Sequence, residues 1–200
     1  MYKYCKTVID LFLIITFLPI WLCIYFVLAF LIYVKLGKPI LFTQKRLGQN
    51  GHAFFVFKFR TMTNEKDKEG NLLDDHIRLT SFGRFLRASS LDELPSLFNV
   101  IKGEMAIVGP RPFIAQYKDL YSDFQMRRHE VKPGITGWAQ VNGRNAITWE
   151  QKFKYDVWYV DHMSFWIDLK IVLKTIRKVI ISEGINSGVD STMEFFKGNK

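Results

Sequence analysis

The sequence predicts a mixed, helix-rich α/β domain that follows an apolar N-terminal membrane segment. From Leu11 to Val34 no side chain is charged, and after it short aromatic and β-branched stretches alternate with segments of helical spacing. Neither an internal repeat nor a linker of biased composition divides this remainder. We therefore expect a membrane helix over residues 1–36 and a cytosolic domain over residues 37–200, with membrane-surface helices and a loose C-terminal tail.

Length and charge limit the functions to consider. Two hundred residues suffice for one domain with a stable core. The formal net charge of +9 indicates anionic partners, with nucleic acid, anionic lipid and nucleotide sugars all open. Cys5 and Cys23 are the only cysteines and lie in or beside the apolar stretch. We expect reduced thiols in a cytoplasmic protein, not a disulfide framework or a zinc site.

The apolar stretch would form a straight helix roughly 36 Å long at about 1.5 Å per residue, enough to cross a bilayer. Pro19 lies within it, however, where it removes a backbone hydrogen bond and predicts a kink. Basic residues flank both ends: Lys3, Lys6, Lys35 and Lys38. Because positive charge favours the cytoplasmic side, a re-entrant helix that turns at Pro19 fits both features. A simple transmembrane helix is the alternative.

The next segments read as a hairpin and a loop. Two stretches, residues 40–43 and 54–59, predict strands, and Gly48 to Gly51 predicts the turn between them. The charged, glycine-containing stretch from Asn64 to Asp75 predicts an exposed loop.

Helices dominate the second half. Helical spacing is found over residues 79–86, 94–101, 149–159 and 164–181, and Ile107-Val108 predicts a short strand before a rigid turn. The basic and apolar helix over 164–181 fits either an anionic membrane surface or a core-facing position with lysines in water. The last twenty residues, rich in Gly, Ser and Asn, indicate the loose tail.

Two adjacent acids, Asp92 and Glu93, are placed at a helix start. A structural role is open, because Ser90 to Glu93 fits a capping box and Asp92 could itself be the N-cap, with Pro95 in the first turn. A chemical role is also open. The helix dipole favours an ionised carboxylate there, so Asp92 could attack phosphorus while Glu93 binds Mg²⁺ through oxygen.

Four cations are candidates to hold phosphate: Lys58, Arg87, Arg111 and Arg144. A guanidinium fork matches two phosphate oxygens, although a single arginine is more often a solvated surface residue. Prolines on both sides of Arg111 restrict its backbone, and Gly143 beside Arg144 permits close approach to a ligand. Asp156 and Asp168 could pair with these cations or cap helices.

Carboxylates beside arginines, behind an apolar segment, suit a membrane-bound phosphoryl-group transferase. The four histidines lack metal-ligand spacing, and Lys45-Arg46 and Arg127-Arg128-His129 are too short to indicate nucleic acid binding. Two other classes stay open: a membrane scaffold that docks glycosyltransferases and a nucleotide-sugar hydrolase. The intact acidic pair argues against the scaffold.

Five blocks in chain order resemble the bacterial sugar transferase family, the monotopic phosphoglycosyl transferases. They are Phe57 to Met62, Ser90 to Pro95, Phe98 to Val100, Val108 to Pro112 and Pro133 to Arg144. The chain lacks the additional regions of longer members. It is similar to the small form, and most of all to the transferases of N,N′-diacetylbacillosamine 1-phosphate in protein glycosylation.

The resemblance implies transfer of a sugar 1-phosphate from a UDP-sugar to undecaprenyl phosphate, with release of UMP. It implies that Asp92 forms a covalent phosphosugar intermediate and that Glu93 binds Mg²⁺ at the diphosphate. Lys58, Arg87, Arg111 and Arg144 would hold phosphate or uridine. The expected partners are these two substrates, membrane lipids and downstream glycosyltransferases, at the cytoplasmic face of the bacterial inner membrane.

One residue departs from the family pattern. A serine usually precedes the proline of the re-entrant helix, and here the residue is Leu18. Because a serine hydroxyl could satisfy backbone groups freed by the break, the sharpness of the turn is the feature that this departure affects.

Overall fold

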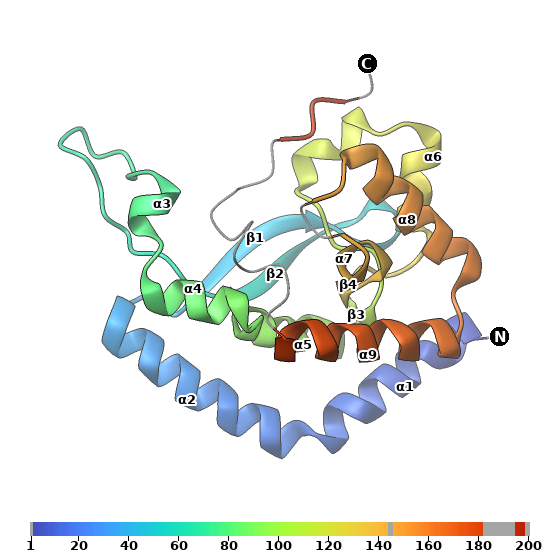
Figure 1. Cartoon of the computed structure of the whole chain (residues 1–200), viewed down its shortest axis with the longest axis horizontal. Coiled ribbons are helices and arrows are strands. Elements are labelled where there is room, and N and C mark those ends of the chain that lie inside the picture. The colour runs from blue at the N-terminus through green and yellow to red at the C-terminus, as the bar shows by residue number, and fades with distance from the viewer. Residues whose placement is uncertain (1, 144–145, 182–194, 199–200) are drawn as a thin grey trace.

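The computed structural model describes residues 2–143, 146–181 and 195–198. Figure 1 shows helices α1 and α2 meeting in an open V along one side of the molecule. Helices α4, α5 and α9 lie along the inside of this V, and the strands lie on the side of these helices away from the V. The architecture is mixed α/β and rich in helix, as the sequence predicts.

The N-terminal segment forms two helices, α1 (Tyr2–Thr16) and α2 (Leu18–Leu36). Within the described part of the chain, α2 is the helix that is long and apolar enough to cross a membrane, judged by length and composition. Its outer side chains are exposed; among them are Ile20, Phe26, Val27, Phe30 and Val34. Cys5 and Cys23 are free and exposed.

The chain breaks at Phe17, two residues before the proline, and Pro19 lies in the first turn of α2. This position suits proline, because the first turn leaves backbone N–H groups without partners in the helix. The indole of Trp21 donates a hydrogen bond to the carbonyl oxygen of Ile14 at 3.0 Å. An indole therefore satisfies a backbone group at the break, where Leu18 offers no hydroxyl.

A two-stranded antiparallel sheet follows. Strands β1 (Leu41–Leu47) and β2 (Ala53–Phe59) pair from Leu41 opposite Phe59 to Leu47 opposite Ala53, with the 3₁₀ turn η1 (Gln49–Gly51) between them. The predicted hairpin is therefore correct, and its first strand is longer than expected. The predicted loop contains turns and leads into the short helix α3 (Asp75–Arg78).

Helix α4 (Ser81–Ala88) starts after Thr80, whose hydroxyl accepts a hydrogen bond from the Gly83 N–H at 2.9 Å. The single helix expected over residues 94–101 is wrong. The chain instead forms a 3₁₀ helix, η2 (Leu91–Ser96), which continues into α5 (Leu97–Ile101). Pro95 lies inside η2 and cannot donate a backbone hydrogen bond, which accounts for a 3₁₀ helix, and not an α-helix, before α5.

A second sheet pairs β3 (Ala106–Val108) with β4 (Gly134–Thr136) in parallel. The two chains approach so closely that a Cβ at Gly134 would lie 2.0 Å from the backbone nitrogen of Gly109. The Gly134 N–H also donates to the Pro110 carbonyl at 3.0 Å. The Pro110 to Pro112 corner is thereby fixed to the Pro133-Gly134 segment.

Helical segments complete the chain: η3 (Ala115–Leu120), α6 (Asp123–Met126), η4 (Arg127–Glu130), α7 (Trp138–Val141), α8 (Trp149–His162) and α9 (Phe165–Ile181). On α9, Ile171 is fully buried, whereas Trp166 and Leu173 are exposed. One side of α9 therefore packs on the core, and the other presents apolar groups outward. Contact of that side with a membrane stays a prediction.

Both ends of the helical V are fixed to the rest of the protein by buried polar groups. Near the start of α1, the ammonium of Lys6 lies 2.5 Å from Asp168 and 3.5 Å from Asp10. At the end of α2, the guanidinium of Arg60 donates to the carbonyls of Leu36, Gly37 and Lys38. These carbonyls lack helical partners, so Arg60 acts as a C-terminal cap supplied by the chain just after β2.

Most of the predicted loose tail lies outside the described residues, and within it the structure describes residues 195–198. The ring of Phe196 is buried among Phe113, Tyr117, Trp149 and Phe153. Its backbone N–H donates to the Tyr117 hydroxyl at 3.2 Å. An aromatic side chain can bury enough area to order this short stretch despite its polar neighbours.

The Lys6 clamp gives a stability prediction. Asp168→Asn removes the charge nearest to a buried ammonium and should lower the free energy of unfolding by about 3 kcal/mol. Asp161→Asn is a matched control, because Asp161 pairs with Arg127 at the exposed surface and should cost less than about 1 kcal/mol. Denaturant unfolding of the purified chain in detergent measures both. Equal losses in the two variants would contradict a dominant role for the clamp.

Candidate active site

The site is built on the edge of β2 that does not pair with β1. The amide of Asn99 accepts from the Phe57 N–H at 3.0 Å and donates to the Phe55 carbonyl at 2.8 Å. The Ser96 hydroxyl donates to the Phe57 carbonyl at 2.8 Å. Both side chains are buried, so they replace a neighbouring strand and hold η2 and α5 against β2.

Ser90 turns the chain from α4 into η2. Its backbone is left-handed, with φ of 57°, which is uncommon for a residue other than glycine. Its side chain makes no cap hydrogen bond. The capping box is therefore wrong: the Ser90 side chain does not cap the helix, and the Glu93 carboxylate makes ion pairs with cations from other segments. The turn directs the two acids toward β2.

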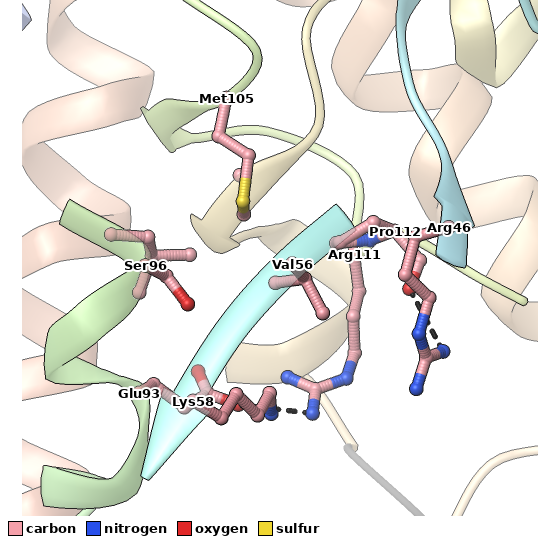
Figure 2. A pocket seen from close by; sticks show the side chains of 10 residues that line it. Arg46, Val56, Lys58, Glu93, Ser96, Met105, Arg111 and Pro112 are labelled. Carbon is pink, nitrogen blue, oxygen red and sulfur yellow. Dashed lines mark hydrogen bonds and ion pairs between the residues drawn. The ribbon is translucent and has the colours of Figure 1, made fainter. Parts of the chain in front are cut away.

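Glu93 is the centre of a three-residue ion-pair cluster. Its Oε1 atom lies 2.5 Å from the Lys58 ammonium on β2 and 3.0 Å from the Arg111 guanidinium in the corner after β3. Figure 2 shows the three side chains converging from separate elements. Burial opposes ionisation, but the two cations outweigh it and hold the pKa of Glu93 well below its usual range.

Asp92 has the opposite balance, although it is the adjacent residue. Burial and then repulsion from ionised Glu93 raise the pKa of Asp92 from 3.8 to about 6. Lys58, Arg111 and Arg87 oppose this rise. The carboxylate is thus surrounded by cations, yet its charge is only partly compensated. A carboxylate in that state can accept an electrophile such as phosphorus.

The other predicted cations are placed as follows. Arg87 lies in the last turn of α4 and donates from Nε to the Thr61 hydroxyl at 3.0 Å, so it is fixed beside the first sheet. Lys58, Arg87, Asp92, Glu93 and Arg111 come together in one region, and their chemical roles stay predictions. Arg144 lies outside the described residues.

A buried ion pair supports the Arg111 corner from behind. The guanidinium of Arg128 contacts Asp156 at 2.7 Å, and both side chains are almost inaccessible to solvent. The Arg128 Nη2 atom that contacts Asp156 also donates to the Arg111 carbonyl at 2.6 Å. The Arg128 guanidinium lies 3.9 Å from the centre of the Phe113 ring. Asp156 therefore acts through Arg128, while Asp168 pairs with Lys6 instead of a phosphate-holding cation.

Sequence reasoning missed two cations near Arg111. A hollow beside the acidic pair is lined in part by Arg46, Lys58, Glu93, Ser96, Arg111 and Pro112. Arg46 donates to the Pro112 carbonyl at 3.2 Å (Figure 2), and burial followed by repulsion from Arg111 lowers its pKa to about 10. Burial and the same repulsion lower the pKa of Lys152 to about 8.

A local signal for these cations is weak. Arg46 lies in a two-residue basic pair on a strand, and Lys152 lies in a helix of mixed charge. Only their proximity to Arg111 in the folded chain distinguishes them. Of the cations, Arg46, Lys58 and Arg111 line the hollow, and positive charge that converges in this way suits a diphosphate.

Comparison with known proteins agrees with this chemistry. The family model for bacterial sugar transferases matches residues 1–182. An uncharacterised sugar transferase, EpsL of Bacillus subtilis (strain 168), is 57% identical over 166 residues, which are 83% of this chain and 82% of that protein.

Two relatives carry names that state a reaction. The UDP-glucose:undecaprenyl-phosphate glucose-1-phosphate transferase of Xanthomonas campestris pv. campestris is 43% identical over 76% of this chain and 34% of its own length. The UDP-N-acetylgalactosamine-undecaprenyl-phosphate N-acetylgalactosaminephosphotransferase of Aeromonas hydrophila is 35% identical over 92% of this chain and 45% of its own length. The chain thus spans less than half the length of these two relatives.

The Glu93 cluster predicts a pH-dependent stability. Glu93→Gln leaves two cations without their shared counter-charge and should lower the free energy of unfolding by about 2 kcal/mol at neutral pH. Because the folded-state pKa of Glu93 is lowered, this contribution exists above the ordinary glutamate pKa and is lost as the pH falls through the lowered value. Unfolding of both proteins across a pH series tests this.

Glu130→Gln is the control for that series. Glu130 pairs with Arg127 at the surface, where solvent screens the interaction, so its loss should be below about 1 kcal/mol. A difference between wild type and Glu93→Gln that stayed constant down to strongly acidic pH would contradict the ion-pair explanation.

Proposed function

The chain belongs to the bacterial sugar transferase family and is a phosphoglycosyl transferase, and we propose that it transfers a sugar 1-phosphate from a UDP-sugar to undecaprenyl phosphate with release of UMP. The observation that carries this proposal is the Asp92-Glu93 pair, surrounded by Lys58, Arg87 and Arg111. Such a site offers a carboxylate nucleophile and positive charge for phosphate oxygens. An attached apolar helix suits a lipid acceptor.

The proposed reaction has two displacements at one phosphorus atom. In the first, an Asp92 carboxylate oxygen attacks the phosphorus that bears the sugar. The bond from that phosphorus to the bridging oxygen breaks, and UMP leaves with this oxygen. In the second, a phosphate oxygen of undecaprenyl phosphate attacks the same phosphorus and regenerates the Asp92 carboxylate. The attacking groups are both anions, so neither displacement requires a side chain to remove a proton.

The cations have separable parts in this scheme. Arg111 and Lys58 neutralise Glu93 in the free protein and would meet the diphosphate when it enters. Arg87 approaches Asp92 from α4 and can stabilise the phosphoryl oxygens of the covalent intermediate. We also assign Arg144 to the donor site, on the strength of the family resemblance.

We propose Mg²⁺ as the cofactor, with Glu93 as its protein ligand. Both cations contact Oε1 of Glu93, which leaves Oε2 as the candidate ligand atom among the contacts of the described residues. Within those residues no cluster of three or more acidic, histidine or cysteine side chains forms a complete metal cage. Mg²⁺ commonly binds one or two carboxylates together with substrate phosphates, and bound there it would offset the diphosphate charge.

We further propose that α1 and α2 form a re-entrant membrane helix, with the catalytic domain at the cytoplasmic face of the bacterial inner membrane. The break at Phe17, the exposed apolar surface of α2 and lysines at both outer ends support this arrangement. A site held at one leaflet would bring a soluble donor and a lipid acceptor together.

The sugar is a narrower question. The two named relatives carry different sugars, glucose and N-acetylgalactosamine. UDP-N,N′-diacetylbacillosamine is our proposed donor because the chain resembles the small family members. The lipid product would then serve glycosyltransferases that extend it in glycoconjugate assembly, including protein glycosylation.

The central test is UMP release from a panel of UDP-sugars, with and without undecaprenyl phosphate. Wild-type membranes should release UMP with one preferred donor. Asp92→Asn should lower the rate by on the order of 10³-fold or more, because the amide is a poor nucleophile. Donor labelled in the sugar phosphate should label wild-type protein covalently and leave the variant unlabelled.

Asp123→Asn is the matched control, since Asp123 lies on the short helix α6 away from the acidic pair and should leave turnover unchanged. Near-normal turnover in Asp92→Asn would remove Asp92 from the nucleophilic role. UMP release with sugar phosphate found in water and none on lipid would identify a hydrolase. No release from the whole panel would favour a scaffold.

Membrane topology is tested by cysteine labelling in intact spheroplasts and inverted vesicles. In a Cys23→Ala background, Cys5 reports the start of α1. In a Cys5→Ala/Cys23→Ala background, Lys38→Cys reports the end of α2. A third reporter, His162→Cys, marks the face of the catalytic domain. A membrane-impermeant maleimide should label all three from the cytoplasmic side. Labelling of the Cys5 and Lys38→Cys reporters from opposite sides would rule out the re-entrant arrangement.

A further inference from the structure

A second cavity lies on the other side of the β3–β4 pair from the hollow beside Glu93. Met105 and Ile135 line that hollow, whereas Ala106 and Val108 of β3 line the second cavity. Alternate residues of a strand point to opposite faces, so the small sheet separates the two spaces. The second cavity has a volume of about 250 Å³ and opens beside the first turns of α1.

The cavity combines an apolar wall with a basic rim. Ala106, Val108 and Val131 form a buried aliphatic wall. Lys3 and Lys132 lie at the lining, and in the part of the chain that the structure describes neither has a carboxylate within ion-pair distance. The Lys132 ammonium donates a 3.4 Å hydrogen bond to the Thr7 hydroxyl.

Lys6 differs from these two lysines, although it also lines the cavity. It is neutralised by Asp10 and Asp168 and is committed to the clamp that fixes α1. Within the described part of the chain, no aspartate or glutamate lines the cavity. Lys3 is exposed and Lys132 is half-buried, so the cavity has positive charge at its rim next to apolar surface, a combination that suits an amphipathic anion.

We infer that this cavity binds one anionic phospholipid, with its headgroup phosphate at Lys3 and Lys132 and the start of an acyl chain against the aliphatic wall. A soluble phosphate would leave the apolar wall uncovered, and a lipid without net charge would leave the lysines unmatched. The location at the start of α1 supports a membrane source for the ligand, because α1 leads directly into the apolar α2.

The inference goes beyond the proposed transfer reaction, since this lipid is not consumed and the acidic pair lies across the small sheet. The experiment therefore measures binding without turnover. Full-length protein is purified into mixed micelles of phosphatidylglycerol and phosphatidylcholine, and the lipid retained per chain is quantified by mass spectrometry. Wild type should retain phosphatidylglycerol in strong preference to phosphatidylcholine.

Two variants test separately the charge of the lysines and the volume of the cavity. The double variant Lys3→Gln/Lys132→Gln should lose phosphatidylglycerol retention by about tenfold or more, because each lysine near an anionic headgroup contributes to binding. Ala106→Leu keeps both charges but fills part of the cavity, and it should also lower retention. Lys66→Gln removes one exposed charge from the loop before α3 and should retain lipid as wild type does.

Circular dichroism and thermal melts confirm that each variant is folded, and the lysine variant alone decides the question if Ala106→Leu does not fold. Equal retention of phosphatidylglycerol by wild type and the lysine variant would overturn the inference. So would an equal loss in Lys66→Gln. Retention of added undecaprenyl phosphate in place of phosphatidylglycerol would show that the site belongs to the acceptor, and the phospholipid assignment would be wrong.

Discussion

The site depends on how the free edge of β2 is satisfied. A two-stranded sheet leaves one row of backbone donors and acceptors unpaired, and here side chains of Asn99 and Ser96 occupy that row. This holds η2 against the strand that carries Lys58, within reach of Glu93. A third strand would satisfy the same backbone groups, but it would place an extended chain where the acidic turn now lies. The side chains thus satisfy the unpaired backbone groups of β2 and at the same time position the acidic turn.

Two adjacent acids acquire different chemistry from the groups around them. Glu93 contacts Lys58 and Arg111 directly and stays ionised, whereas Asp92 receives only longer-range help and is repelled by Glu93. The difference depends on the fixed position of Arg111, which the Pro110 corner and the buried Arg128–Asp156 pair maintain from two directions. Mutations in that supporting pair should therefore affect the charge of the site without touching substrate.

Local patterns in the sequence predicted the hairpin, most long helices and the residues of the acidic cluster, because periodicity, turn residues and short motifs are local signals. The rest required tertiary information. Asp156 pairs with Arg128, which is 28 positions away, and the role of Asn99 is visible only against β2. Pro95 and Pro19 showed in the sequence that the helices near them would be disturbed. They did not show that η2 would be a 3₁₀ helix or that the chain would break at Phe17. At the break, the Trp21 indole donates to the Ile14 carbonyl, a role that the family pattern would assign to a serine hydroxyl.

Arg60 links the apolar helix to the active-site strand within a few residues. Its guanidinium donates to the carbonyls of the last residue of α2 and of the two residues that follow it, and Lys58 lies two positions before Arg60 in the chain. If α2 rests in a bilayer as proposed, its depth affects the position of Lys58 through the hydrogen bonds of Arg60. The height of the reacting phosphorus above the lipid would then depend on the hydrocarbon thickness of the membrane. Because lipid composition sets that thickness, it would also set the distance between the acceptor phosphate and the site through this connection.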